Sequence, residues 1–331
     1  MNVLVTGGAG YIGSHAVKQL SAAGHRVVVL DNLGRGHRQA VPPEVVLIEA
    51  DVRQTQTVTK ALREHQIECV MHFAALAYVG ESVQQPLRYY DNNTAGSLSL
   101  LQAMDQAGVT RIVFSSTCAT YGQPQQVPIT EQTPQAPINP YGWSKLFVEG
   151  MLRDHAATHG QFAFAALRYF NVAGCAADGS LGEDHDPETH LIPVLLLSAL
   201  GKKMGATIFG NDYDTPDGTC IRDYIHVDDL INAHITVMNT LTDGDKRFYN
   251  LGIGKGYSVK QVVEAAQQVT GSDFPVEIGP RRQGDSPMLY ANADKIQSQL
   301  GWRAKSMDID DIVDSAWRWF KAHPQGYGDQ P

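Results

Sequence analysis

The chain has 331 residues, of which 43% are hydrophobic and 18% are charged, and 35 acidic against 26 basic side chains give a formal net charge of −9. A single hydrophobic core stops growing beyond roughly 250–300 residues, so this length predicts two lobes. The apolar content excludes disorder as the main state, and the acidity argues against nucleic acid or a membrane surface as the partner.

Short β-branched runs alternate with helical stretches through the first half of the chain. Runs that are apolar on both faces predict buried strands at 2–6, 26–31, 45–50, 69–73, 111–116 and 162–168. Helices are predicted between them, at 11–23, 55–65, 87–107 and 141–159. This alternation predicts an α/β fold with a doubly wound parallel sheet over residues 1–171.

The sequence pattern changes after Asn171. From there on the predicted strands are shorter and the predicted loops are longer, as at 173–189, 210–222 and 279–286. Long loops in a compact domain are usually functional. We interpret residues 172–331 as a smaller α/β lobe that mainly binds substrate, with a segment at about 227–252 that packs back on the first domain.

No apolar run is long enough for a membrane span, and the N-terminus lacks the basic region of a signal peptide. The four cysteines form no C-x-x-C pair, which predicts reduced thiols and a cytoplasmic location. No metal site is expected, because His72, His226 and His234 lack partners at ligand spacing. The run EDHD at 183–186 is interpreted as a solvated loop cluster.

A glycine-rich turn, GGAGYIG at 7–13, follows the first predicted strand and begins the first predicted helix. Glycines there allow a tight turn and a close approach of the backbone to a pyrophosphate, which the helix N-terminus stabilises. With a strand before and a helix after, the motif predicts a Rossmann-type dinucleotide site that involves Gly7, Gly10, Tyr11, Ile12 and Gly13.

Asp31 ends the second predicted strand, 18 residues past Gly13. A carboxylate at this point accepts hydrogen bonds from the adenosine ribose and repels a 2′-phosphate, so NAD is favoured over NADP. Arg35 and Arg38 lie nearby and are interpreted as solvated loop residues.

Three further positions follow strand ends and are less specific. Asn32 adjoins Asp31, and the pair Asp51-Val52 ends the third strand, where it either meets the adenine or caps a helix. The run Phe73-Ala74-Ala75 ends the fourth strand, and its small residues would let a cofactor lie against the backbone.

Tyr141 and Lys145 lie four residues apart at the start of a predicted helix, and Ser115-Ser116-Thr117 ends the strand before it. An ammonium beside a phenol, together with the positive helix end, lowers the phenol pKa. Tyr141 could then exchange a proton with a substrate hydroxyl, with Thr117 sharing the hydrogen bond.

The sequence resembles the extended short-chain dehydrogenase/reductase family, and within it the 4-epimerases of UDP-glucose and UDP-galactose. The resemblance runs from Val3 to about Tyr327. It rests on these ordered blocks: TGGAGYIGSH 6–15, DNL 31–33, VGESV 79–83, YYDNN 89–93, SST 115–117, YGWSK 141–145, RYFN 168–171, IFGNDY 208–213, RDYIHV 222–227, YNLG 249–252 and RRQGD 281–285.

The resemblance implies that a tightly held NAD oxidises the sugar at C4, and that the 4-ketose turns over and is reduced on its opposite face. Tyr141 would be the base, Lys145 would bind the nicotinamide ribose, and Asn92 and Phe170 would face the cofactor. The implied UDP-sugar contacts are Asn171, His190, Leu191, Thr207, Phe209, Arg222, Arg282 and Asp285. A homodimer through helices 87–107 and 141–159 is also implied.

Two positions depart from some family members. Ala77 stands where these have a lysine near the nicotinamide. Leu289 stands where they have a tyrosine beside the sugar 2-substituent, so UDP-N-acetylglucosamine is a candidate second substrate.

Three other functions are compatible with parts of the sequence. A 4,6-dehydratase needs an Asp-Glu pair after the threonine, and Cys118-Ala119 stands there instead, so it is rejected. A UDP-pentose (UDP-xylose/UDP-arabinose) 4-epimerase stays open. A non-catalytic NAD-sensing protein is disfavoured, because a sensor has no need of Tyr141 and Lys145.

Overall fold

A computed structural model describes residues 1–282 and 285–328 of the chain, which form two compact units. Unit 1 comprises Met1–Gly122, Pro134–Arg168 and Ile231–Tyr249. Unit 2 comprises Gln123–Thr133, Tyr169–Leu230 and Asn250–Pro331.

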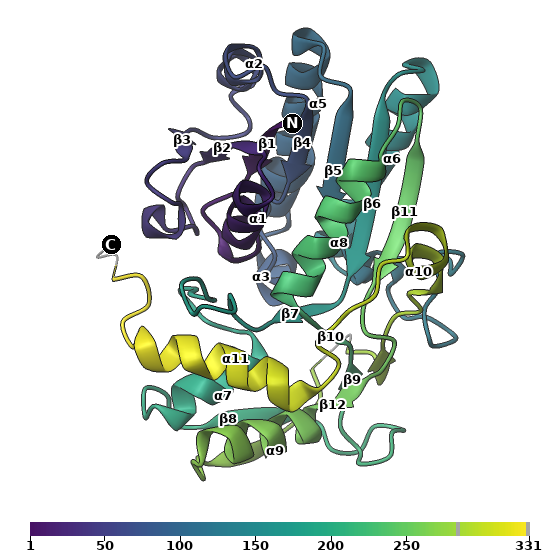
Figure 1. Ribbon diagram of the computed structural model, residues 1–331. Helices are drawn as coiled ribbons and strands as arrows, with labels where there is room; N and C mark the ends of the chain where they lie inside the picture. The colour runs from purple at the N-terminus through teal and green to yellow at the C-terminus, as the bar shows by residue number, and fades with distance from the viewer. Residues whose placement is uncertain (283–284, 329–331) are drawn as a thin grey trace. The chain divides into compact units, whose positions relative to one another are not determined.

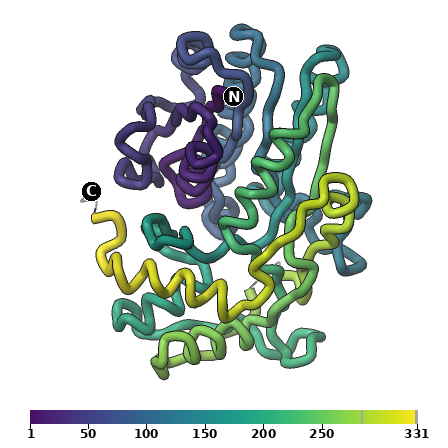
Figure 2. The backbone as a smooth tube through the Cα atoms, in the orientation of Figure 1, coloured from purple at the N-terminus to yellow at the C-terminus, as the bar shows by residue number. Residues whose placement is uncertain are grey.

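Unit 1 is built on a seven-stranded sheet in the order β11-β6-β5-β4-β1-β2-β3 (Figure 1). The strands are β1 (Asn2–Thr6), β2 (Arg26–Asp31), β3 (Val46–Glu49), β4 (Cys69–His72), β5 (Arg111–Ser115), β6 (Ala163–Tyr169) and β11 (Lys246–Leu251). Within the described residues, β1 to β6 pair in parallel. The predicted α/β doubly wound sheet is confirmed. Figure 2 shows the late strand β11 returning beside β6.

Helices cover both faces of this sheet. In Figure 1, α1 (Tyr11–Ala22) and α8 (Val227–Thr240) lie on the near face, while α2 (Thr55–Glu64), α5 (Gly96–Ala107) and α6 (Pro140–Thr158) lie behind. Apolar residues of α2, α5 and α6 pack with the strands in one buried core that includes Leu62, Leu100 and Leu152. Gly108 ends α5 with φ 74°, a left-handed conformation that glycine adopts without strain.

The helix expected at 87–107 is interrupted. It begins after α3 (Val79–Gln84) as α4 (Pro86–Tyr89), widens into a π-helical turn at Tyr90–Ala95, and continues as α5. Such π turns occur frequently at functional sites. Short 3-10 turns lie at Arg38–Ala40 and Cys118–Tyr121.

Unit 2 contains short strands and four helices around its own core. The strands are β7 (Asn171–Ala173) with β10 (Tyr224–His226), β8 (Ala206–Phe209) with β13 (Val276–Gly279), and β9 (Ile221–Arg222) between β12 (Tyr257–Ser258) and β14 (Met288–Leu289). Its described helices are α7 (Leu191–Ala199), α9 (Val259–Thr270), α10 (Asp294–Leu300) and α11 (Ile309–Ala322). Residues of α7, α9 and α11 share a buried core that includes Leu195, Val262 and Trp319.

One expectation about the loop before α7 is wrong. The run at 183–186 is not a solvated cluster, because the Glu183 side chain is only 5% exposed and contacts His185 and His190. The sequence could not reveal this burial, because it depends on the fold of the loop. Among the described residues, none of the helices combines the length and hydropathy needed to cross a membrane.

Candidate active site

The turn between β1 and α1 allows a close approach of the backbone. Gly7 has φ 73°, and a Cβ there would lie 2.6 Å from the Ala74 nitrogen. A Cβ on Gly13 would lie 2.0 Å from the Gly7 carbonyl oxygen. Both positions therefore require glycine, and the turn lies beside the end of β4 at the point where the strand order reverses, which is where such sheets bind ligands.

Asp31 ties the end of β2 to this turn. One carboxylate oxygen accepts a hydrogen bond from the Ala9 N–H at 2.9 Å, and the other accepts one from the Leu33 N–H at 2.9 Å. Burial raises the pKa of Asp31 above its usual value, while these N–H donors lower it. Each oxygen retains a second lone pair with which it could accept a ribose hydroxyl.

Asp51 does not cap a helix, because the N-cap of α2 is Gln54. The Asp51 carboxylate instead accepts hydrogen bonds from Arg53 and from the Asn32 amide, the latter at 3.1 Å. The Arg53 guanidinium holds the pKa of Asp51 well below its usual range. Val52 is buried beside it.

Arg35 and Arg38, the two arginines that follow Asp31 in the sequence, are each paired with a carboxylate. Arg35 contacts Glu81 at 2.9 Å and lies 4.3 Å from the centre of the Tyr78 ring. Arg38 contacts Glu49 at 2.6 Å. These ion pairs favour a structural role for both arginines over the binding of a 2′-phosphate. Asp31 is then the charged group at the end of β2.

The start of α6 brings Tyr141 and Lys145 to the carboxyl end of β5. Asn139 caps the helix by accepting the Gly142 N–H at 2.8 Å. The Lys145 ammonium donates to the Ser115 carbonyl at 2.8 Å, and burial lowers the pKa of Lys145 to about 7. The Tyr141 ring lies edge-on to Tyr89, with 6.5 Å between the ring centres.

Thr117 follows β5 in extended backbone and is 6% exposed. Its side-chain oxygen accepts the Ala119 N–H at 3.1 Å, so its own hydroxyl hydrogen remains available for donation. The remaining predicted cofactor residues of unit 1 lie at the ends of the neighbouring strands β1 and β4. Tyr11 and Ile12 begin α1, which follows β1, and Phe73, Ala74 and Ala75 follow β4.

Sequence reasoning selected Asn92 and overlooked its neighbour. The Asn93 side chain is buried; it accepts the Leu76 N–H at 2.8 Å and donates to the Leu76 carbonyl at 2.9 Å and to the Ser144 hydroxyl at 3.0 Å. The Ser144 hydroxyl in turn donates to the Tyr141 carbonyl at 2.7 Å. Asn92 donates to Asn93. The π turn thus fixes the loop after β4 and the first turn of α6.

The same turn is anchored to the sheet by a buried histidine. Burial lowers the pKa of His72 to about 3, so its ring is neutral. It contacts Thr6 at 2.7 Å and Ser97 at 2.9 Å, and the Ser97 hydroxyl donates to the Asn93 carbonyl at 2.6 Å. A chain of hydrogen bonds therefore links the end of β1 to the residue predicted as the base.

Unit 2 brings together the positively charged residues expected at a pyrophosphate. The Arg222 and Arg282 guanidinium groups both approach Asp285, at 3.8 and 3.1 Å. Arg222 also donates to the Ser286 carbonyl at 2.8 Å, and Arg282 lies 4.7 Å from the centre of the Phe209 ring. The two arginines therefore converge, as an anionic ligand requires.

The other predicted substrate residues of unit 2 lie on neighbouring strands and at a helix start. Leu289 pairs with Arg222 in the parallel β14–β9 register, and Asn171 pairs with Tyr224 in β7–β10. Thr207 is on β8, and His190 and Leu191 begin α7. Phe170 belongs to unit 2 and Thr117 to unit 1, so the predicted cofactor and substrate sets each include a residue from the other unit.

The residues of unit 1 fit a dinucleotide. The turn at Gly7 and Gly13 has no room for side chains, the N-terminus of α1 follows it, and a carboxylate ends the next strand. These are the features that a pyrophosphate and a ribose require.

Comparisons with known proteins agree with this geometry. A sequence model of the NAD dependent epimerase/dehydratase family matches residues 3–252. A UDP-glucose 4-epimerase from Lactobacillus helveticus is 51% identical over 331 residues, with 100% of both chains covered. A crystal structure of a UDP-glucose 4-epimerase is 46% identical, has a TM-score of 0.95 and covers 99% of each chain.

A further solved structure holds ligands. The UDP-glucose 4-epimerase of Bifidobacterium longum, in complex with NAD+ and UDP, is 40% identical with a TM-score of 0.95, over 98% of this chain and 100% of that one. The chain therefore belongs to the NAD dependent epimerase/dehydratase family, and its cofactor is NAD.

Proposed function

We propose that this chain interconverts UDP-glucose and UDP-galactose by reversible oxidation at C4 of the sugar. The observation that carries the proposal is the position of Tyr141 and Lys145 one turn apart at the start of α6, where Lys145 donates to Ser115 at the carboxyl end of β5, two residues before Thr117, in the unit that holds the glycine turn. A proton-transfer group in the unit that would hold NAD matches the activity named for the relatives.

The chain's own residues supply the proton chemistry. NAD, which the glycine turn and Asp31 would hold, would supply reversible hydride transfer at the sugar carbon. Tyr141 takes the proton of the 4-hydroxyl and gives it back, and the Thr117 hydroxyl holds the same oxygen by a hydrogen bond. Lys145, fixed by the Ser115 carbonyl, places a positive charge beside the phenol when protonated.

Unit 2 supplies the contacts for the UDP-sugar. Arg222 and Arg282 bind the pyrophosphate, and Asp285 holds their side chains in position through the observed ion pairs. Asn171, His190, Leu191, Thr207 and Phe209 complete the predicted contacts. The net charge of −9 makes these two cations decisive, because an anionic substrate needs a local positive field.

The test is conversion of UDP-galactose to UDP-glucose by the purified chain, first without and then with added NAD. Tyr141→Phe should lower turnover by about 10²- to 10⁴-fold, the usual contribution of a general base, while bound NAD is retained. No conversion by the wild type with NAD present would overturn the activity. Unchanged turnover of Tyr141→Phe would remove that residue from the chemistry.

Leu289 favours a broader substrate range. Its side chain has no hydroxyl and less bulk than the tyrosine of some relatives, so a larger sugar 2-substituent would fit beside β14. UDP-N-acetylglucosamine and UDP-xylose are assayed with UDP-galactose at equal concentration. Turnover of the N-acetyl sugar supports the wider site, and turnover of the pentose alone would favour a UDP-pentose 4-epimerase.

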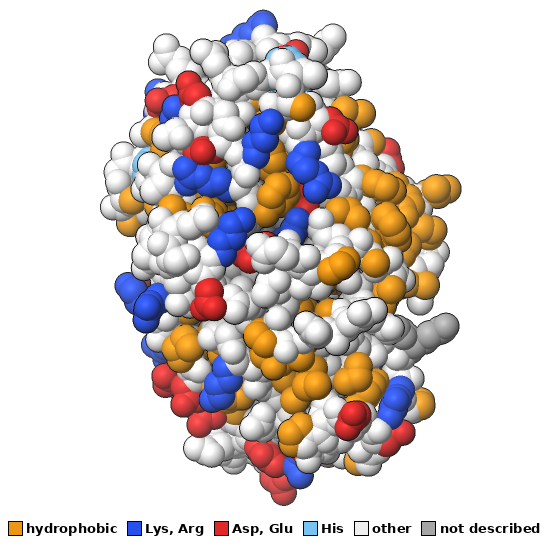
Figure 3. Space-filling model, turned by 90° about the vertical axis from the view of Figure 1, so that its right-hand side faces the viewer, with side chains coloured by type: hydrophobic (Ala, Val, Ile, Leu, Met, Phe, Trp, Pro, Cys, Tyr) orange, Lys and Arg blue, Asp and Glu red, His pale blue; other side chains and the backbone are white. Residues whose placement is uncertain are grey.

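We also propose a homodimer through the helical segment 87–107 and α6. Both segments expose large apolar side chains, including Leu87, Leu98, Trp143 and Phe147. Phe147 contacts Trp143 and Tyr90, with 5.7 and 6.0 Å between ring centres. Figure 3 shows hydrophobic side chains gathering on one side of its view. A second copy that pairs the same helices would bury such a surface symmetrically.

Light scattering tests the dimer. Phe147→Glu should give a monomer, whereas Met204→Glu, at a methionine of unit 2 that is 98% exposed, should leave the dimer intact. A monomeric wild type would contradict the interface. The cytoplasmic location and the division into an NAD-binding 1–171 and a mainly substrate-binding 172–331 stay predictions.

A further inference from the structure

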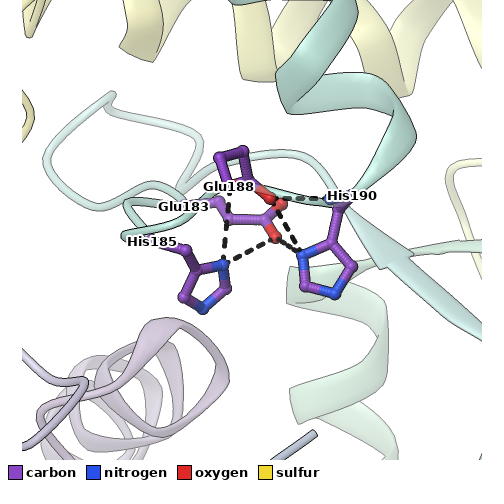
Figure 4. Close-up of side chains that lie close together, drawn as sticks. All are labelled: Glu183, His185, Glu188 and His190. Carbon is purple, nitrogen blue, oxygen red and sulfur yellow. Dashed lines mark hydrogen bonds and ion pairs between the residues drawn. The ribbon is translucent and has the colours of Figure 1, made fainter. Parts of the chain in front are cut away.

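The loop before α7 contains a pattern that the proposed reaction does not use. Its sequence EDHDPETH, at 183–190, holds two E-x-H units five residues apart. Figure 4 shows the four Glu and His side chains of these units turned toward one another. We call them the Glu/His cluster: Glu183, His185, Glu188 and His190.

Three of the four side chains of the cluster are largely shielded from solvent, and the fourth, His190, is 43% exposed. The Glu183 and Glu188 side chains are each 5% exposed, and that of His185 is 17% exposed. Two carboxylates this close to each other repel strongly when buried, so the site requires a compensating positive charge.

Three of the four N···O separations within the cluster are close to the edge of a tetrahedral zinc site, and the fourth, between His190 and Glu183, is shorter. His185 Nδ1 lies 3.2 Å from Glu183 and 3.5 Å from Glu188, and His190 Nδ1 lies 2.7 Å and 3.2 Å from the same two carboxylates. One ligand atom from each residue lies within 4.8 Å of the others. A tetrahedron with ligands about 2.0–2.1 Å from zinc has edges of about 3.3 Å.

Ion pairing alone explains this arrangement less well. Each imidazole turns the same nitrogen, Nδ1, toward both carboxylates, and one N–H can point along only one N···O line. If both rings were protonated, their like charges would also face each other, with 5.3 Å between the ring centres. A single cation at the centre satisfies all four ligand atoms at once.

We propose that the Glu/His cluster binds one Zn²⁺ ion as a closed, four-ligand structural site. Imidazole ligands select zinc over Mg²⁺ or Ca²⁺, which prefer oxygen ligands in larger coordination numbers. The backbone around the site supports this role, because one Glu188 oxygen accepts the N–H groups of Thr189 and His190, both at 2.7 Å. The ion would hold the irregular segment 183–190 at the start of α7.

A consequence for His190 rests on the proposed function. Zinc on Nδ1 leaves the ring proton on Nε2, on the side of the ring away from the cluster. The His190 side chain is 43% exposed, so this N–H could donate to the UDP-sugar. Loss of the ion should therefore raise KM for UDP-galactose and leave kcat nearly unchanged.

The experiment measures metal content of the untagged, full-length protein by mass spectrometry after incubation with ZnSO₄ and gel filtration. We expect about one Zn²⁺ per chain, and a rise in Tm of roughly 5 °C relative to chelator-treated protein. His185→Ala should lose both effects. The matched control is His159→Ala, in a second and more exposed group of possible ligands with Asp105 and His155, which should keep them.

Co²⁺ provides a readout that does not need a variant, because a tetrahedral site gives the intense visible absorption that octahedral Co²⁺ lacks. Wild-type protein that takes up no zinc and shows no such absorption would overturn the site, as would full zinc retention by His185→Ala. These outcomes do not depend on turnover, so failure of the epimerase assay would leave the metal result intact.

Discussion

A buried ion pair beneath the proposed catalytic residues offers a strong test of the energetics. Glu149 of α6 and Arg168 of β6 are 0% and 3% exposed and form two hydrogen bonds, at 2.9 and 2.6 Å. Arg168 also donates to the Tyr121 hydroxyl, and Glu149 accepts from Ser116 and Gln135. Burial lowers the pKa of Arg168, but its bonds to Glu149 raise it above the usual value.

The perturbation is Glu149→Leu, which leaves a guanidinium buried without its carboxylate. Breaking a buried pair from one side costs about 3–5 kcal/mol, a large share of the roughly 5–15 kcal/mol that stabilises a typical protein. The double variant Glu149→Leu/Arg168→Met removes both charges, so it should recover about 2 kcal/mol or more of that loss.

The assay is urea unfolding of NAD-saturated protein followed by circular dichroism. Its control is Asp243→Asn, which breaks the exposed pair between Arg111 and Asp243, 36% and 55% exposed, and should cost less than about 1 kcal/mol. A Glu149→Leu variant as stable as the control, or a double variant less stable than the single one, would refute the reasoning.

Three further predictions concern the sites. The pKa of Lys145 is about 7 in the folded chain, below its ordinary 10.5, so the unfolded chain binds more protons between these two pH values. The buried lysine therefore destabilises the folded state fully below pH 7, and this destabilisation fades as the pH rises above 7. In the absence of NAD, the free energy of unfolding of Lys145→Met, measured with urea, should therefore exceed that of the wild type by up to ~4 kcal/mol at pH 6 and by less at pH 9. A difference that does not change with pH would contradict this. Gly13→Ala should release NAD, since the new Cβ overlaps the Gly7 carbonyl, whereas Gly160→Ala, with open space around its Cβ, should gain about 0.4–1 kcal/mol in unfolding free energy and keep NAD. Leu289→Tyr should lower kcat/KM for UDP-N-acetylglucosamine relative to UDP-galactose by roughly tenfold or more, and equal losses for both sugars would argue against a role in specificity.

The first lobe could be predicted because its signals are local. Apolar runs mark β1, β2 and β5 within a residue of their observed bounds, and the glycines at 7–13 act within a few residues. Each signal has a direct physical cause in backbone conformation or burial. The same reasoning correctly brought Tyr141 and Lys145 to the start of α6.

Other features depend on contacts between distant residues and leave little trace in a local pattern. Only half of the residues of strand β11, KRFYNL, are apolar, so its sequence is a weak strand signal. Its position beside β6 depends on contacts between segments far apart in the chain. Glu149 looks like a solvated helix residue until Arg168 is brought to it from β6. The π turn at Asn93 depends on partners at Leu76 and Ser144, which are 17 and 51 residues away.

The residues that make these non-local contacts share one property in the folded chain. Glu149, Asn93 and Glu183 are polar, and each is fully or nearly fully buried with several partners. A buried polar group without hydrogen-bond partners destabilises the fold by its full desolvation free energy. A polar group that is buried must therefore have partners held in a fixed geometry around it. In this chain the first two fix the base of the proposed catalytic helix, and the third fixes the loop that leads to His190. Buried polar residues that have several partners therefore mark where the fold positions its chemistry.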